Sequence, residues 1–158
     1  MFRHARYYAP AQVIDVVRDI VVTPDLALVL DVDTLERSAL AKIDWVMLLA
    51  LDALSYAGVR IVFAARHEGE RAVRLQQRLG GVVYMNPDEM QLTRLRDRSE
   101  RLRLLVISDD PDLLASLAPQ DCGIALGRPE LACSNIAVAG DTSVRATLWW
   151  LVDERSRS

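Results

Sequence analysis

The sequence predicts an α/β fold in which a mostly parallel central sheet lies between two layers of helices. Short, continuous apolar runs alternate with helical segments along the chain. Apolar runs of this kind, bounded by turn residues, are typical of strands buried on both faces. The length of 158 residues suits one domain, and a hydrophobic content of 51% suits a packed core. Strands that alternate with helices form βαβ units, so we expect a three-layer sandwich.

The first part of the chain contributes one helix, one strand and a second helix. Pro10 opens an amphipathic helix over about residues 10–21, and Thr23-Pro24-Asp25 ends it. The apolar run Leu26–Leu30 is then a buried strand. The segment Ile43–Tyr56 is predicted to be a helix, apolar nearly all round, that ends before Gly58. A helix that is apolar on every face is usually buried on every face, so this segment suggests a subunit contact.

The middle of the chain supplies two further strands and two helices. Val59–Ala64 is a second buried strand. Glu68–Leu79 is an arginine-rich amphipathic helix that ends at Gly80-Gly81. Val82–Met85 is a short third strand, and Pro87 opens a helix or helical turn that runs to about Arg98.

The last part of the chain repeats the alternation. Arg103–Ser108 is a fourth strand, and Pro111–Leu117 is a helix that begins at its proline. Gly123–Leu126 and Ile136–Ala139 are the fifth and sixth strands. Asp141 or Thr142 caps a final helix over Ser143–Asp153, and residues 154–158 are expected to fray. We therefore expect one domain over residues 1–158 with its core at about 26–152.

Composition excludes several classes of protein. The net charge of −3 and the pI of about 5.4 give no reason to expect a nucleic-acid partner. No apolar run approaches the roughly 20 residues that cross a bilayer, and the N-terminus lacks a signal-peptide core. Cys122 and Cys133 do not have the spacing of a zinc site, so we expect reduced thiols in a cytoplasmic protein.

Common motifs of other enzyme classes are missing from the sequence. There is no Gly-x-Gly-x-x-Gly after the first strand and no Gly-x-x-x-x-Gly-Lys, so dinucleotide and P-loop sites are not expected. There is no Gly-x-Ser-x-Gly elbow of a serine hydrolase. A phosphorylated receiver domain needs a lysine after a late strand, and Lys42, the sole lysine of the chain, lies too early to supply it.

Aspartates follow two of the predicted strands at the point where each strand ends. Asp31 and Asp33 come after the first strand, and Asp109 and Asp110 come after the fourth. Ligands of parallel sheets bind at the carboxyl ends of the strands, near the point where strand order reverses. Clustered carboxylates need a cation or protons, and their hard oxygens suit Mg²⁺. The alternative is that these aspartates only begin turns and cap helices, as Asp109-Asp110-Pro111 would do in any fold.

Several of these segments resemble one enzyme family. Leu28-Val29-Leu30-Asp31-Val32-Asp33-Thr34-Leu35 resembles the first motif of the haloacid dehalogenase superfamily, an Asp-x-Asp after a buried strand. Ile107-Ser108-Asp109-Asp110 resembles its fourth motif. The stretch Cys122–Gly127 and the lead-in Pro24–Leu28 are similar to those of sugar-phosphate and trehalose-phosphate phosphatases. The resemblance covers about residues 26–152. Too few residues separate the motifs for a cap domain, so it implies a capless three-layer core.

The resemblance implies a role for each aspartate. Asp31 would be the nucleophile that accepts a phosphoryl group, and Asp33 would be the acid/base. Asp109 and Asp110, together with Asp31 and Asp33, would hold Mg²⁺. The implied reaction is hydrolysis of a phosphomonoester through an aspartyl-phosphate.

The resemblance places Thr34, Ala64, Arg66 and His67 at the positions that would hold the phosphate. Arg66 stands where the family often has an arginine, and His67 beside it could contact a ligand, but other positions depart from the family pattern. Thr34 follows Asp33 directly, where the family usually has Gly-Thr, and Leu35 comes next. Ala64 stands where the family has a serine or threonine, and its side chain cannot donate a hydrogen bond. Lys42 is misplaced for the family's lysine, which leaves the arginines between residues 94 and 103 as substitutes or as a solvated helix face.

Two functional hypotheses follow from this mixture. The first is a Mg²⁺-dependent phosphohydrolase that acts on a small phosphorylated substrate. The second is a catalytically degenerate relative that serves as a scaffold or binds a protein partner. The apolar helix at Ile43–Tyr56 also suggests a homo-oligomer, and Trp149 and Trp150 are expected to pack in the last helix, with one of them partly exposed.

Overall fold

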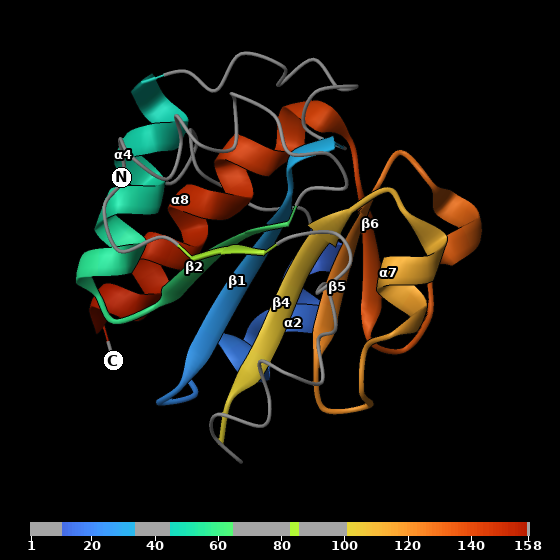
Figure 1. Cartoon of the computed structure of the whole chain (residues 1–158), viewed down its shortest axis with the longest axis horizontal. Coiled ribbons are helices and arrows are strands. Elements are labelled where there is room, and N and C mark those ends of the chain that lie inside the picture. Colours follow the sequence, from blue (N-terminus) through green and yellow to red (C-terminus); the bar gives the residue numbers. More distant parts are fainter. Residues whose placement is uncertain (1–10, 34–44, 65–82, 86–100, 158) are drawn as a thin grey trace.

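Six strands form one sheet in the order β3-β2-β1-β4-β5-β6, and every neighbouring pair runs parallel (Figure 1). The structure is a computed structural model that describes residues 11–33, 45–64, 83–85 and 101–157. The strands are β1 (Leu26–Asp31), β2 (Arg60–Ala64), β3 (Val83–Met85), β4 (Arg103–Ser108), β5 (Cys122–Leu126) and β6 (Ile136–Ala139). The helices are α2 (Ala11–Val21), α4 (Trp45–Tyr56), α7 (Pro111–Ala115) and α8 (Asp141–Arg157), with a short 3₁₀ helix η2 (Pro129–Leu131). The predicted α/β class, a parallel sheet flanked by helices, is confirmed.

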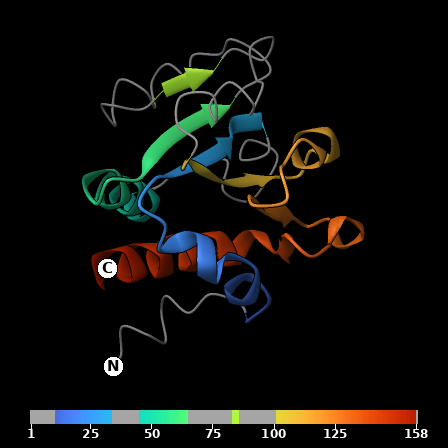
Figure 2. The ribbon, with the colours of Figure 1, turned by 90° about the horizontal axis from the view of Figure 1, so that it is seen from below.

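The two faces of the sheet are covered by different helices. Successive side chains of a strand point to opposite faces. In β1, Leu26, Leu28 and Leu30 pack into the cluster that contains the buried residues of α2, α4 and α8. Ala27 and Val29 pack into the second cluster, with the two buried leucines of α7. Figure 2 shows α2, α4 and α8 on one side of the sheet and α7 on the other.

The strand order reverses between β1 and β4. From β1 the chain passes through α4 to β2 on one side, and from β4 it passes through α7 to β5 on the other. Right-handed crossovers in opposite directions place their helices on opposite faces, which is why α4 and α7 lie apart. The connections after β1 and β4 therefore diverge, and this is the position where parallel sheets bind ligands.

The predicted strands agree with the observed ones to within a residue at each described end. α7 is shorter than predicted and ends at Ala115, because Ser116 and Leu117 donate backbone hydrogen bonds three residues back and tighten the last turn. The predicted helices Glu68–Leu79 and Pro87–Arg98 lie outside the described residues.

The expectation that residues 154–158 fray is wrong for residues 154–157. α8 begins at Asp141, two residues earlier than predicted, and continues to Arg157. Arg155 secures its end, because Nη1 donates to the carbonyl oxygens of Val21 at 3.2 Å and Thr23 at 2.5 Å. Val21 is the last residue of α2 and Thr23 follows it, so the contact joins the last helix of the chain to the end of the first described helix.

From Leu48 to Tyr56, α4 has both buried and exposed side chains. Leu48, Leu51 and Leu54 are buried, whereas Leu49 is 51% exposed and Tyr56 is 97% exposed. Trp149 and Trp150 of α8 are both half-buried and pack against the core. The predicted subunit contact of α4 stays a prediction. In the part of the chain that the structure describes, no helix has the length and apolar character needed to cross a membrane.

Candidate functional site

Asp31 and Ser108 meet at the carboxyl ends of β1 and β4. The two strands are neighbours, with Leu30 opposite Ile107 in register. Because Leu30 and Ile107 both face α2, α4 and α8, the residue after each of them faces the side of α7. Ser108 Oγ donates a hydrogen bond of 2.6 Å to Asp31 Oδ2, and both residues are buried. A carboxylate is therefore held at the point where the strand order reverses.

Small residues lie in register with this pair on the two neighbouring strands, β2 and β5. Ala64 of β2 lies opposite Asp31, and Ala125 of β5 lies opposite Ser108. Both alanines pack on the α7 face and are fully buried. Neighbouring strands lie about 4.8 Å apart, so Ala64 is adjacent to Asp31, but its side chain brings no polar atom to it.

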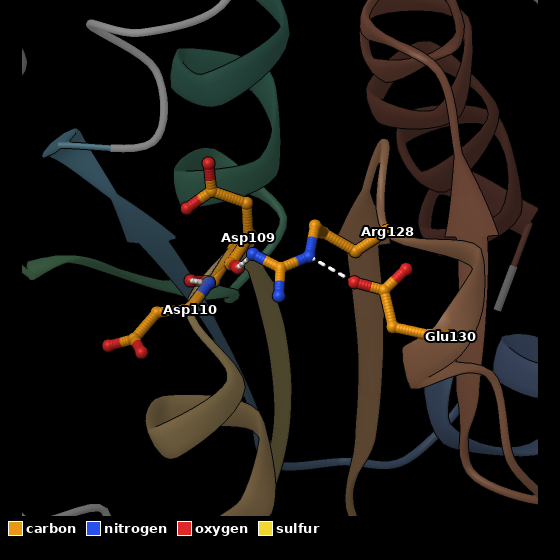
Figure 3. A network of polar contacts seen from close by, with 5 residues as sticks. Asp109, Asp110, Arg128 and Glu130 are labelled. Carbon is orange, nitrogen blue, oxygen red and sulfur yellow. Dashed lines mark hydrogen bonds and ion pairs between the residues drawn. The ribbon is translucent and has the colours of Figure 1, made fainter.

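Asp110 is the N-cap of α7. Its Oδ1 accepts a hydrogen bond of 3.1 Å from the backbone N–H of Asp112, and its own N–H donates to Ser108 Oγ at 2.9 Å. The helix-capping role that we considered for this residue is thus confirmed. Figure 3 shows the side chains of Asp109 and Asp110 pointing in different directions from the end of β4.

Asp33 follows β1 in a helical conformation and is half-buried. Together with Asp31 and Asp109 it offers hard carboxylate oxygens of the kind that Mg²⁺ prefers. Within the described ranges, however, no three His, Cys, Asp or Glu side chains gather as an ion-binding group. The donors fit a Mg²⁺ ion that is held by one or two carboxylates, with water and substrate oxygens completing its shell. They do not form an all-protein cage.

Arg128 is a residue of this edge that sequence reasoning missed. It follows β5, pairs through Nε with the carboxylate of Glu130, and donates from Nη1 to the carbonyl oxygen of Asp109 at 3.5 Å (Figure 3). The hydrogen bond from Arg128 lowers the pKa of Glu130. Arg128 stands directly after the stretch Cys122–Gly127, so its place at a strand end was a usable signal.

The remaining predicted positions divide into two groups. Thr34, Arg66, His67 and Lys42 lie outside the described residues, and so do the arginines from Arg94 to Arg98. Arg101 and Arg103, which were candidates to replace the lysine, lie before and at the start of β4. Arg103 is in register with Leu26, five residues before Asp31 along β1, which corresponds to about 16 Å. Of the two interpretations offered for these arginines, a role in place of the lysine does not fit Arg103, because it lies at the amino end of its strand and Asp31 lies at the carboxyl end.

A pocket of about 290 Å³ lies at the amino ends of β4 and β5, against α2. Its lining includes Asp19, Arg103, Cys122 and Asn135. Burial, with smaller effects of Asp121 and Asp19, raises the pKa of the Cys122 thiol to about 11. Its Sγ donates to the carbonyl oxygen of Val16 at 3.2 Å. Cys122 and Cys133 are both free thiols, as predicted.

No protein-family model and no curated protein matches the chain. Solved structures with a partly similar backbone include a mycobacterial quinone oxidoreductase, at 14% sequence identity and a TM-score of 0.45. The match covers 93% of this chain and 54% of that one. Glucose dehydrogenase from Haloferax mediterranei, in complex with NADP, Zn and gluconolactone, matches at 16% identity and a TM-score of 0.44, over 84% of this chain and 43% of that one. The chain thus spans about half the length of these structures. At these values the likeness assigns neither a family nor an activity.

Proposed function

We propose that the chain is a capless domain similar to the haloacid dehalogenase core, and that it hydrolyses a phosphomonoester with Asp31 as the nucleophile. The observation that carries the proposal is the position of Asp31. Its carboxylate stands at the end of a central strand, where the strand order reverses, and Ser108 Oγ holds Oδ2 at 2.6 Å. A carboxylate fixed by one oxygen has its second oxygen oriented for attack, which lowers the entropic part of the barrier.

The reaction would proceed in two displacements. A carboxylate oxygen of Asp31 forms a bond to phosphorus while the bond to the ester oxygen breaks, and Asp33 gives its proton to that leaving oxygen. Water then attacks the phosphorus of the aspartyl-phosphate, and Asp33 takes the proton from this water. The bond between Asp31 and phosphorus breaks, and inorganic phosphate leaves. Asp33 follows Asp31 by two residues and remains half-buried, which suits proton exchange with solvent.

Mg²⁺ would be held by Asp31 and Asp109, with the backbone carbonyl of Asp33, as the resemblance implies. When bound, it would offset the negative charge that builds up on the phosphoryl oxygens. Asp110 is a weaker candidate for this role, because its Oδ1 caps α7.

A catalytically degenerate domain that binds a partner is the second candidate. Ala64 is the observation that favours it, since this residue adjoins Asp31 in register and offers no hydrogen-bond donor from its side chain. Loss of one oriented donor to a developing charge typically lowers kcat about a hundred- to a thousand-fold. Turnover by this site would then be slow.

The test is hydrolysis of p-nitrophenyl phosphate by the purified chain, with Mg²⁺ and with a chelator. Asp31→Asn keeps the size of the side chain and removes the nucleophile. Asp15→Asn is the matched control, because Asp15 is an exposed aspartate of α2 that forms a surface ion pair with Arg18. We expect Mg²⁺-dependent turnover that Asp31→Asn abolishes and Asp15→Asn leaves unchanged. Turnover equal in all three proteins, or none in a folded wild-type chain, would favour the degenerate domain.

A further inference from the structure

Arg128 brings a guanidinium group to the carboxyl ends of the strands, where the aspartates lie. Gly127, at the end of β5, has a φ of +65°, a conformation that side-chain-bearing residues rarely adopt. This turn redirects the chain so that Arg128 reaches back to the end of β4, where Nη1 contacts the carbonyl oxygen of Asp109. Asp109 adjoins Ser108, the hydrogen-bond partner of Asp31. The guanidinium therefore contacts the residue that directly follows Ser108, the hydrogen-bond partner of the proposed nucleophile.

The aspartates at these strand ends repel a phosphorylated ligand, so a cation is needed for such a ligand to bind. Asp31, Asp33, Asp109 and Asp110 follow β1 and β4, and their combined field opposes an approaching anion. A guanidinium carries five N–H donors in a planar fork that matches two oxygens of a phosphate. Contacts to Glu130 and to Asp109 occupy Nε and Nη1 only. The remaining donors of Arg128 make no hydrogen bond to another described residue.

Glu130 already offers Arg128 a carboxylate. The two side chains are 41% and 56% exposed, and they are separated by a single residue in the chain. Exposed ion pairs of this kind contribute little, because water and salt screen them. A phosphate group carries more charge than one carboxylate and can make two parallel hydrogen bonds to the guanidinium. It is therefore a suitable competitor for the place of Glu130.

We infer that Arg128 is the residue that receives the phosphate group of the ligand, and that Glu130 is an internal competitor that occupies Arg128 in the ligand-free chain. The inference deepens the proposed function and rests on the same edge of the sheet. The site would then favour dianionic phosphate monoesters over carboxylates, because a dianion interacts more strongly with the guanidinium than the carboxylate of Glu130 that it replaces.

The experiment measures binding of inorganic phosphate to the full chain by calorimetry, with and without Mg²⁺. Glu130→Gln removes the competing charge, and we expect phosphate to bind about two- to five-fold more tightly. Arg128→Gln removes the receiving cation, and we expect binding to weaken about ten-fold or more. Arg60→Gln is the matched control, because Arg60 is an equally accessible arginine that pairs with Asp25 at the other edge of the sheet. It should leave the dissociation constant within about two-fold.

Binding that Arg128→Gln leaves unchanged, or that Glu130→Gln weakens, would overturn the inference. Absence of phosphate binding to both the wild type and Glu130→Gln would overturn it as well. Failure of the proposed function is a separate result. If phosphate binding follows Arg128 and Glu130 while Asp31→Asn does not alter hydrolysis, the oxyanion site stands and the nucleophile assignment falls.

Discussion

Replacing Ser108 with alanine tests the buried polar network at the centre of the sheet edge. Ser108 is fully buried, and its Oγ donates to Asp31 Oδ2 at 2.6 Å and accepts from the N–H of Asp110 at 2.9 Å. A hydrogen bond to a charged group contributes about 1.5–3 kcal/mol, and one between neutral groups contributes about 0.5–1.5 kcal/mol. Since Ser108→Ala removes both, we expect the free energy of unfolding to fall by about 2–4 kcal/mol.

Urea denaturation followed by circular dichroism measures this loss, and Ser116→Ala is its control. Ser116 also donates from Oγ, to the backbone carbonyl oxygen of Asp112 at 2.9 Å, but on the exposed surface at the end of α7. That variant should lose about 0.5 kcal/mol or less. Equal losses in the two variants would refute the reasoning, because they would mean that the bond between Ser108 and Asp31 adds nothing beyond a surface contact. In the proposed enzyme Ser108→Ala should also lower kcat more than it raises KM, since it misorients the nucleophile without touching the phosphate.

Three further predictions concern Asp121, Cys122 and Ala64. Asp121 is fully buried and accepts hydrogen bonds from the N–H groups of Leu104 at 3.0 Å and Ala118 at 3.3 Å. Asp121→Ala should therefore lower the free energy of unfolding, measured by urea denaturation, by about 2–5 kcal/mol. A loss below about 1 kcal/mol would contradict this role. Burial raises the pKa of Cys122 to about 11 and Cys133 is exposed, so at pH 8 a disulfide reagent should modify Cys133 faster by about ten-fold or more. Comparable rates in Cys122→Ala and Cys133→Ala single variants would argue against the burial of Cys122. Ala64→Ser places a hydroxyl group beside Asp31, and any hydrolysis of p-nitrophenyl phosphate should rise about ten-fold or more, towards the contribution of an oriented donor. Unchanged hydrolysis would indicate that this position does not face the phosphate.

The strands and their order along the chain could be predicted from the sequence because each is a short apolar run between turn residues. Such a run loses contact with water wherever it lies in the sheet, so its local pattern suffices to identify it. The same reasoning located Asp31 and Asp109 at strand ends. It also identified Asp110-Pro111 as a helix start, because a capping aspartate followed by proline is a local signal.

Contacts between segments that are distant in the sequence could not be predicted from local sequence patterns. The tail that was expected to fray continues as helix to Arg157, because Arg155 bonds to carbonyls more than 130 residues away. The position of Arg103 along the chain made it one candidate to replace the lysine, yet the parallel register assigns it to the amino ends of the strands, away from Asp31. Its side chain alone carries no information about which end of the sheet it joins.

The sequence by itself determined an α/β chain with carboxylates after its first and fourth strands, because apolar runs and turn residues act over a few positions. Only the tertiary structure decided which groups those carboxylates meet. Ser108 lies 77 residues from Asp31, and the two touch because β1 and β4 are neighbours and the alternation of side chains turns both to one face. Arg128 reaches the same edge because β5 is the next strand along. Strand order is set by packing of the whole sheet, and no local stretch of sequence encodes it.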